Sequence, residues 1–299
     1  MSRVYPSKLL LFGEYTVIQQ SAALATPYYK YKTFWSDGSI PENFELSLSE
    51  EDCKKGLWSI YEDLLAKDLQ SLDLSQLEKD LKEGLWLISN SPIGYGLGSS
   101  GAVCAALFDR YGTKKVEDRT VLQQTLAELE CSFHGKSSGI DPLVSYLQQP
   151  LWVQAGGKVV PTSLPPLSNS SIFLIDSQHP RVSTPLIHFF VEQSKKDSFL
   201  QDFVAPVAAA VDQAIAAWQK EDGQALLEAV QLISEKQLLY LHPMVLPDWR
   251  PLWEKGLETN DFYLKICGAG GGGFLLGFAE DWERAAGYLD TSCSEQLFL

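Results

Sequence analysis

Two glycine-rich stretches constrain this chain more than any other feature of its sequence. GYGLGSSGA runs from Gly94 to Ala102, and GAGGGG runs from Gly268 to Gly273. Both contain the spacing G-x-G-x-x-G that is typical of dinucleotide-binding turns. The two stretches lie in different sequence surroundings, so this spacing alone assigns a ligand to neither of them.

The residues after the first stretch exclude a dinucleotide-binding turn. Such a turn needs a helix, then a second apolar strand, then an acidic residue about 20 positions on. Helix formers follow from Ala102, but the next segment, GTKKVEDRT, is polar throughout and supplies no strand. The complete Walker-type motif is absent as well. A glycine loop before a helix N-terminus remains, in which backbone N–H groups and the hydroxyls of Ser99 and Ser100 can meet a phosphate. A tight connection that binds nothing is the alternative.

The second stretch joins two strand-like segments, LKI and FLLGF. Four consecutive glycines lose much conformational entropy on folding, so they are costly in a connection of this kind. This cost indicates that the backbone of the stretch must approach another group closely.

The charge balance limits the partners of the protein. Its 299 residues include 24 basic and 38 acidic side chains, a net charge of -14 without a basic stripe, so a nucleic-acid duplex would be repelled. An anionic substrate would have to be held by a few placed cations, backbone amides and a metal ion. The five cysteines are scattered without metal-ligand spacing, and the apolar runs are shorter than a membrane span. We therefore expect a cytoplasmic protein that binds neither nucleic acid nor a membrane.

Hydrophobic periodicity predicts a chain that mixes helices and strands. The expected helices are 49–69, 75–83, 120–134 and 199–240, besides the one from residue 102. The expected strands are 9–12, 15–18, 85–88, 172–176, 264–266 and 274–278. Gly156, Gly157 and the Pro- and Ser-rich run 161–171 form the best candidate boundary, which divides the chain into domains 1–165 and 166–299.

Three charged residues are candidates for chemistry. Glu130 lies near the edge of the apolar stripe of its helix, so it can be half-buried and face a cleft. Asp141 precedes Pro142 in the form of a helix start with Asp at the N-cap, where the helix dipole favours the ionised carboxylate. Lys8 directly precedes an apolar strand. A solvated helix carboxylate, a helix cap and a surface lysine are the ordinary alternatives. His134 lacks a second ligand at metal spacing, which favours a packing or hydrogen-bonding role.

Together these segments resemble the GHMP family of small-molecule kinases, and the mevalonate kinases within it most closely. SKLLLFGEYTV (7–17) is similar to the N-terminal motif, SPIGYGLGSSGA (91–102) to the phosphate-binding motif, and KICGAGGGGF (265–274) to the C-terminal glycine motif. ECSFHGKSSGID (130–141) and HPRVST (179–184) look like segments of the mevalonate kinases in particular. The resemblance implies a two-domain α+β fold, with an N-terminal domain like domain 2 of ribosomal protein S5, a ferredoxin-like C-terminal domain, and the active site between them.

The resemblance also assigns roles to individual positions. Asp141 would be the catalytic base, and Lys8 would contact the phosphate and Asp141. Glu130 and Ser100 would be the Mg²⁺ ligands. The nucleotide ATP would be bound by Gly94, Tyr95, Gly96, Leu97, Gly98, Ser99, Ser100, Gly268, Ala269, Gly270 and Gly271. The residues near the acceptor would be Glu14, Tyr15, His134, Arg181 and Ser183.

The activity implied is transfer of the γ-phosphate of ATP to the primary hydroxyl of mevalonate, a step of isoprenoid biosynthesis. The partners implied are small molecules, and a homodimer is a possible assembly. The sequence departs from the mevalonate kinase pattern at three positions: Tyr15 replaces the usual His, Ser137 the usual Pro, and Gly101 a common Ala. Phosphomevalonate kinases share the Gly-Glu-Tyr form, so phosphomevalonate, a sugar or homoserine are alternative acceptors.

A protein of GHMP fold that binds a metabolite without turnover is the alternative outside the enzymes. The joint presence of Lys8, Glu130 and Asp141 argues against it, because a pure binder has no need of a base.

Overall fold

The computed structural model describes residues 3–67, 69–134, 137–167 and 169–299. Its contacts divide the chain into two compact units that are not continuous in sequence. The first unit consists of Met1–Leu9, Thr26–Ile93 and Leu97–Gln149; the second consists of Leu10–Ala25, Gly94–Gly96 and Pro150–Leu299. These units depart from the two continuous segments, 1–165 and 166–299, that the sequence suggests. The physical reason is that the first two strands are long enough to contribute to both units.

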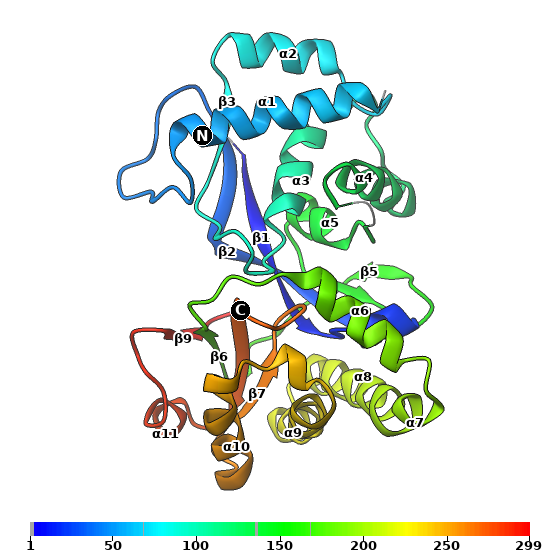
Figure 1. The fold of residues 1–299 in the computed structure, drawn as a ribbon, viewed down its shortest axis with the longest axis vertical. Helices are drawn as coiled ribbons and strands as arrows, with labels where there is room; N and C mark the ends of the chain where they lie inside the picture. The colour runs from blue at the N-terminus through cyan, green and yellow to red at the C-terminus, as the bar shows by residue number, and fades with distance from the viewer. Residues whose placement is uncertain (1–2, 68, 135–136, 168) are drawn as a thin grey trace. The chain divides into compact units, whose positions relative to one another are not determined.

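The first unit combines antiparallel strands with helices. Its strands are β1 (Val4–Phe12) and β2 (Ala23–Ser36), which continue into the second unit, and β3 (Trp86–Ser89), which pairs with β2. Its helices are α1 (Glu50–Ala66), α2 (Leu74–Lys82), α3 (Ser99–Tyr111), α4 (Arg119–His134) and α5 (Ile140–Leu147). Helices α3, α4 and α5 pack against one another, and α1 packs on β3 (Figure 1).

Local sequence explains how these helices begin and which side they bury. Ser49 caps α1, because its hydroxyl accepts the N–H group of Asp52. Helix α4 buries Leu122, Leu126 and Leu129, the stripe that its periodicity predicts. Apolar side chains from α3, α4 and α5 thus pack together in one core.

The second unit is built on a four-stranded antiparallel sheet with the order β7-β8-β6-β9. These strands are β6 (Ser171–Asp176), β7 (Tyr263–Ile266), β8 (Phe274–Ala279) and β9 (Ser294–Leu297). The longer helices are α6 (Ser183–Gln193), α8 (Ala205–Gln219), α9 (Gly223–Tyr240) and α10 (Arg250–Thr259). The shorter elements are β4 (Leu151–Val153), β5 (Val159–Pro161), α7 (Asp197–Phe199), α11 (Trp282–Ala286), the 3₁₀ helices η1 (Thr16–Gln19), η3 (His242–Met244) and η4 (Pro247–Trp249), and the π-helical turn η2 (Leu200–Val204).

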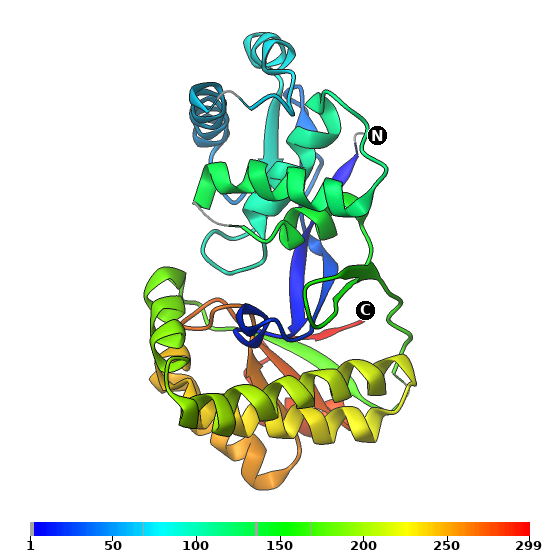
Figure 2. The same ribbon diagram turned by 90° about the vertical axis from the view of Figure 1, so that its right-hand side faces the viewer.

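The connectivity of this sheet is that of a ferredoxin-like domain. Along the chain the strands and the helical segments between them follow the pattern β-α-β-β-α-β, and the first strand, β6, lies between the third and the fourth. Helices α8 and α9 lie side by side along one face of the sheet (Figure 2), and α9 packs against β7 and β8. The expectation of an α+β fold with a ferredoxin-like C-terminal domain is confirmed.

Two local expectations are wrong. The strand expected at 15–18 is the 3₁₀ helix Thr16–Gln19, because the chain turns sharply at Tyr15, where φ is 65°. Asp141 is not the N-cap of its helix: α5 is capped by Gly139, which adopts a left-handed conformation, and begins at Ile140. The carboxylate of Asp141 still lies in the first turn, where the helix dipole favours negative charge.

One helical stretch contradicts the expectation that the apolar runs are shorter than a membrane span. Asp197–Gln219 is long and apolar enough to cross a membrane, judged by length and composition alone. In the structure Val207, Val211, Ile215 and Trp218 of this stretch are buried within the second unit. The stretch therefore packs as the core helix of a globular unit does.

Candidate active site

A buried lysine and a carboxylate meet in the first unit. Lys8 lies on β1, and its backbone N–H donates to the carbonyl of Leu97 at 2.7 Å, which joins the strand to the glycine loop. The Nζ atom of Lys8 lies 2.9 Å from Oδ1 of Asp141 in the first turn of α5. The side chain of Lys8 is 7% exposed and that of Asp141 is 32% exposed, so solvent and solutes reach this pair through the carboxylate.

Glu130 of α4 lies in the same region with two hydroxyl partners. Ser100 donates to its Oε1 atom at 3.2 Å, and the hydroxyl of Ser137 donates to its Oε2 atom. Burial, together with the negative charge of Asp141, raises the pKa of Glu130 to about 7, although both hydroxyls and the Lys8 ammonium oppose the rise. The carboxyl therefore gains or loses its proton near neutral pH.

Two glycines of the loop make room for Asp141. A Cβ atom at Gly98 would lie 3.0 Å from Oδ2 of Asp141, and one at Gly101 would lie 2.8 Å from the carbonyl carbon of Asp141. Gly98 also has a φ of 67°, which side chains seldom adopt, and it is the N-cap of α3. The first glycine stretch thus ends in a helix N-terminus, as predicted, and its glycines let α3 and the start of α5 touch.

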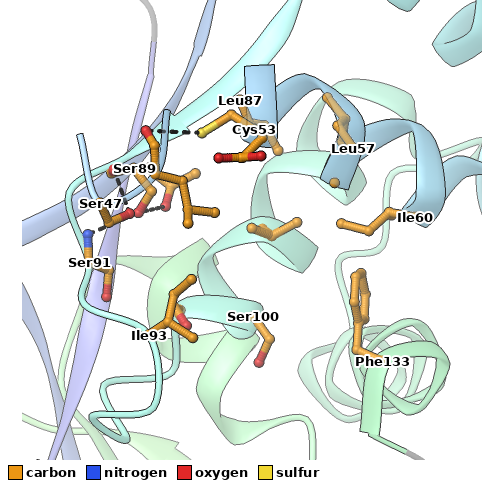
Figure 3. Close-up of a pocket in the computed structure, with 16 residues that line it drawn as sticks. Ser47, Cys53, Leu57, Ile60, Leu87, Ser89, Ser91, Ile93, Ser100 and Phe133 are labelled. Carbon is orange, nitrogen blue, oxygen red and sulfur yellow. Dashed lines mark hydrogen bonds between the residues drawn. The ribbon is translucent and has the colours of Figure 1, made fainter. Parts of the chain in front are cut away.

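An apolar cavity of about 270 Å³ opens beside the serines of the glycine loop (Figure 3). Leu57 and Ile60 of α1, Val103 of α3 and Phe133 of α4 line it on several sides. Ser99 and Ser100 form part of its wall, together with the further lining residues Thr33, Ser47, Leu48, Asp52, Cys53, Gly56, Leu87, Ser89, Ser91 and Ile93. The sequence reading did not find this cavity, because its walls come from separate elements.

A second polar cluster lies in the second unit. Glu14 and Lys265 form an ion pair whose side chains are 1% and 0% exposed, and Lys265 also donates to the carbonyl of Ile266 at 2.8 Å. Tyr15, 5% exposed, donates its hydroxyl to the carbonyl of Ala269 at 2.6 Å. Glu14 is therefore a buried carboxylate paired with Lys265, a residue that was not among the site residues predicted from the sequence.

The loop Gly268–Gly273 contacts other parts of the same chain closely. Of its glycines, 268, 270, 271, 272 and 273 all have positive φ. A Cβ atom would lie 2.5 Å from the carbonyl oxygen of His179 at Gly272, and 2.7 Å from that of Tyr95 at Gly273. The N–H groups of Gly271 and Gly273 donate to the carbonyls of Met244 and His179. The prediction that this backbone approaches another group is confirmed, and the groups that it approaches belong to the protein itself.

Arg181 connects both glycine stretches within the second unit. Its Nη1 atom donates to the carbonyl of Cys267 at 2.7 Å, and its backbone N–H donates to the carbonyl of Gly94 at 3.1 Å. A Cβ atom would lie 1.5 Å from its Nη2 atom at Gly96 and 2.6 Å at Gly268. The guanidinium therefore occupies space that only glycine leaves open at both positions.

The structure distributes the predicted site residues over two clusters. The first unit brings together Lys8, Leu97, Gly98, Ser99, Ser100, Glu130 and Asp141, and the second brings together Glu14, Tyr15, Gly94, Tyr95, Gly96, Arg181, Gly268, Ala269, Gly270 and Gly271. Ser183 begins α6 and is partly exposed. The side chain of His134 lies outside the described part of the chain. Lys265 was missed, although a lone lysine inside an apolar strand before a glycine run is a signal that could have found it.

Comparison with known proteins agrees with the resemblance to the GHMP kinases and with the two-domain α+β fold. Residues 60–149 match the family model of the GHMP kinases N terminal domain. The chain is similar to the L. major mevalonate kinase solved in complex with R-mevalonate, at 16% identity and a TM-score of 0.67, with 98% of this chain and 92% of that one covered. It is also similar to the Streptococcus pneumoniae phosphomevalonate kinase in complex with phosphomevalonate and AMPPNP, at 16% identity and a TM-score of 0.67, covering 99% and 100%. A third similar structure is Lactococcus lactis galactokinase complexed with galactose, at 13% identity and a TM-score of 0.65, covering 98% and 91%. No curated protein matches the sequence.

The fold is that of a two-domain α+β protein with a glycine loop before a helix N-terminus. Residues 60–149 match the N-terminal domain of the GHMP kinases, and the whole chain has the fold of the mevalonate kinase to which it is similar. Members of this family are phosphotransferases with alcohol acceptors. At identities of 16% and 13% the structural likeness shows the fold and assigns no acceptor.

Proposed function

We propose that this chain is an ATP-dependent phosphotransferase that acts on the primary hydroxyl of a small hydroxy acid, with mevalonate as the first candidate. The observation that carries the proposal is the cluster of Lys8, Asp141, Glu130 and Ser100 at the N-terminus of α3. Phosphoryl transfer demands chiefly positioning and charge neutralisation. A buried ammonium, two carboxylates and a helix N-terminus after a glycine loop supply both.

Asp141 is suited to accept the proton of the acceptor hydroxyl. Its carboxylate is the exposed member of the pair with Lys8, so an acceptor reaches it first. Lys8 holds the carboxylate in one orientation, and its ammonium adds positive charge near the transferred phosphoryl group. The acceptor oxygen loses its proton to Asp141 as it forms its bond to the γ-phosphorus of ATP, and the bond from that phosphorus to the bridging oxygen breaks, so that ADP leaves.

Glu130 and Ser100 have the donor atoms that Mg²⁺ prefers. This ion is usually bound by one or two carboxylates together with substrate phosphates and waters. Within the described residues there is no group of three or more His, Cys, Asp or Glu that could hold a metal, so a site here would need the phosphates of the nucleotide. When bound, Mg²⁺ would neutralise charge on these phosphates. Because the pKa of Glu130 is about 7, ion binding should release a proton and weaken below that pH.

The apolar cavity fits the base of the nucleotide. Its walls of Leu57, Ile60, Val103 and Phe133 suit a flat apolar ring, and Ser99 and Ser100 lie at the end where phosphates would follow. Val103→Trp should fill the cavity and raise the KM for ATP more than it lowers kcat, since the reacting groups are untouched. Leu65→Trp on the surface of α1 is the control. An unchanged KM for ATP in Val103→Trp would show that the adenine base of ATP does not bind in this cavity.

The test of the proposal is an ADP-release assay with four acceptors. Mevalonate should give the highest kcat/KM among mevalonate, phosphomevalonate, galactose and homoserine. The Gly-Glu-Tyr form and the likeness to a phosphomevalonate kinase make phosphomevalonate the second candidate. Activity with none of the four would contradict the proposal and favour a protein that binds a metabolite without turnover.

A further inference from the structure

The chain around Tyr15 holds the start of the second glycine loop. From Lys265 to Ala269, every second residue contacts the segment Leu10–Tyr15. The contacting pairs are Lys265 with Glu14, Cys267 with Leu10, and Ala269 with Tyr15. The last contact lies inside the loop, where the Tyr15 hydroxyl donates to the Ala269 carbonyl at 2.6 Å.

Tyr15 makes this contact from a strained backbone. It has φ 65° and ψ -47°, and the N–H of Thr16 donates to the carbonyl of Glu14 at 2.7 Å. These values describe a γ-turn centred on Tyr15, a conformation that costs free energy in a residue with a side chain. Such strain persists only where the surrounding contacts impose it, and it occurs preferentially at functional sites.

The ring of Tyr15 is fixed on its other side by an aromatic cluster. Its centroid lies 5.0 Å from that of Phe190 on α6, and Phe190 in turn lies 5.8 Å from Phe199 and 6.5 Å from Phe203. Phe199 and Phe203 stack at 5.0 Å across the π-helical turn Leu200–Val204, a rare conformation that often marks functional sites. Ring and hydroxyl together leave Tyr15 little freedom.

We propose that Tyr15 is a positioning residue that sets the shape of the loop Gly268–Gly273. Through the loop it positions Arg181, a candidate acceptor residue whose guanidinium donates to the Cys267 carbonyl at 2.7 Å and packs on Gly268, and so sets the affinity for the acceptor. The kinetic part of this inference rests on the proposed function. The Tyr15 hydroxyl is buried, and burial raises its pKa, so it stays a donor to Ala269 across the physiological pH range. The family resemblance places Tyr15 near the acceptor; in this proposal Tyr15 acts on the acceptor indirectly, through the loop. A histidine in its place, being shorter, would not reach the Ala269 carbonyl.

The first experiment needs no activity. In the ligand-free full chain, Tyr15→Phe should speed amide hydrogen exchange in peptides that cover 268–273 roughly tenfold, because one buried hydrogen bond is lost. Tyr15→His should have the same effect, since the donor no longer reaches. Tyr240→Phe is the matched control: it removes a hydroxyl from a ring that packs on Phe199 and Phe203. Unchanged exchange at 268–273 in Tyr15→Phe, in a protein that still melts cooperatively, would overturn the proposal.

The second experiment separates positioning from direct contact. Tyr15→Phe should raise the KM of the acceptor roughly tenfold while kcat stays within about threefold, because Lys8 and Asp141 are untouched. A raised KM without faster exchange would mean that the hydroxyl touches the acceptor itself, and would overturn the proposal. Faster exchange in a chain that phosphorylates no acceptor would contradict the proposed function and leave the role of Tyr15 in the loop standing.

Discussion

Asp141 pairs with the ammonium of Lys8 on one side and packs against two glycines on the other. Lys8 orients its carboxylate at 2.9 Å, whereas Gly98 and Gly101 leave the space that its side chain and backbone occupy. This explains the departure at residue 101: an alanine Cβ would lie 2.8 Å from the Asp141 carbonyl carbon, too close for any real contact. The position of the carboxylate therefore depends on two residues without side chains.

The role of Asp141 as the base can be tested by removing its charge alone. Asp141→Asn keeps the shape of the side chain, so nucleotide binding should persist while turnover falls by roughly 10²- to 10⁴-fold. ADP release and a nucleotide-binding titration measure the two effects. Asp63→Asn, at an exposed position of α1, is the control. Turnover near the wild-type rate in Asp141→Asn would rule out this base.

Gly101→Ala tests whether the fit between α3 and α5 matters for catalysis. The added methyl group must push the start of α5 away, and a displacement of about 1 Å can cost up to about 10²-fold in rate. We expect kcat to fall by roughly 10- to 100-fold with little change in the KM for ATP. Gly287→Ala, where a Cβ atom lies 3.2 Å from its nearest neighbour, is the control. A wild-type kcat in Gly101→Ala would show that α5 adapts freely.

At the scale of elements, α4 places the Glu130 carboxylate where it accepts hydrogen bonds from the first turn of α3 and from the segment after α4. The stripe of leucines orients α4, and this orientation buries Glu130 beside Ser100 at the start of α3. Helical periodicity predicted that Glu130 would be half-buried, and it is 6% exposed. The partner Ser137 could not be foreseen, because it comes from the segment after the helix.

The raised pKa of Glu130 predicts how stability depends on pH. Between its ordinary value of 4.5 and about 7, the folded protein keeps a proton that the unfolded chain releases. The unfolded state therefore binds fewer protons, and stability falls as pH rises through this range. Glutamine does not titrate, so the Tm of Glu130→Gln relative to wild type should increase from pH 5 to pH 8 in the presence of a chelator.

Glu128→Gln is the control for this measurement, because Glu128 is exposed on the same helix. A Tm difference between Glu130→Gln and wild type that does not change with pH would contradict the raised pKa. In the same variant the Mg²⁺ dependence of turnover should weaken; an unchanged Mg²⁺ titration would show that another residue holds the ion.

At the scale of the whole molecule, the units take residues from distant parts of the chain. The second unit includes Leu10–Ala25 and Gly94–Gly96 as well as Pro150–Leu299. Its buried Lys265 finds its carboxylate partner, Glu14, near the N-terminus of the chain. The second unit therefore depends on segments that a division of the sequence at one boundary would remove.

This dependence predicts that residues 166–299 do not fold alone. The fragment would lack strands β4 and β5 and would leave the ammonium of Lys265 buried without a carboxylate, which costs about 3–5 kcal/mol. We expect no cooperative thermal transition by circular dichroism for the fragment, whereas the full chain shows one. A cooperative transition of residues 166–299 would contradict this division into units.

The sequence by itself determined helices α1 to α4, strands β1, β3, β6, β7 and β8, the glycine loop before α3, and the candidates Lys8, Glu130 and Asp141, because periodicity, helix formers and glycine spacing act over a few residues. The ferredoxin-like domain was implied by the family resemblance. The family resemblance implied that Lys8 meets Asp141 and that Glu130 lies near Ser100, and the structure has both contacts. Tertiary structure alone decided that Ser137 meets Glu130 and that Glu14 meets Lys265. It also decided that the GAGGGG glycines make room for Arg181, His179 and Tyr95. Contacts of this kind join residues far apart in the chain, and no local pattern records which distant backbone a glycine must approach.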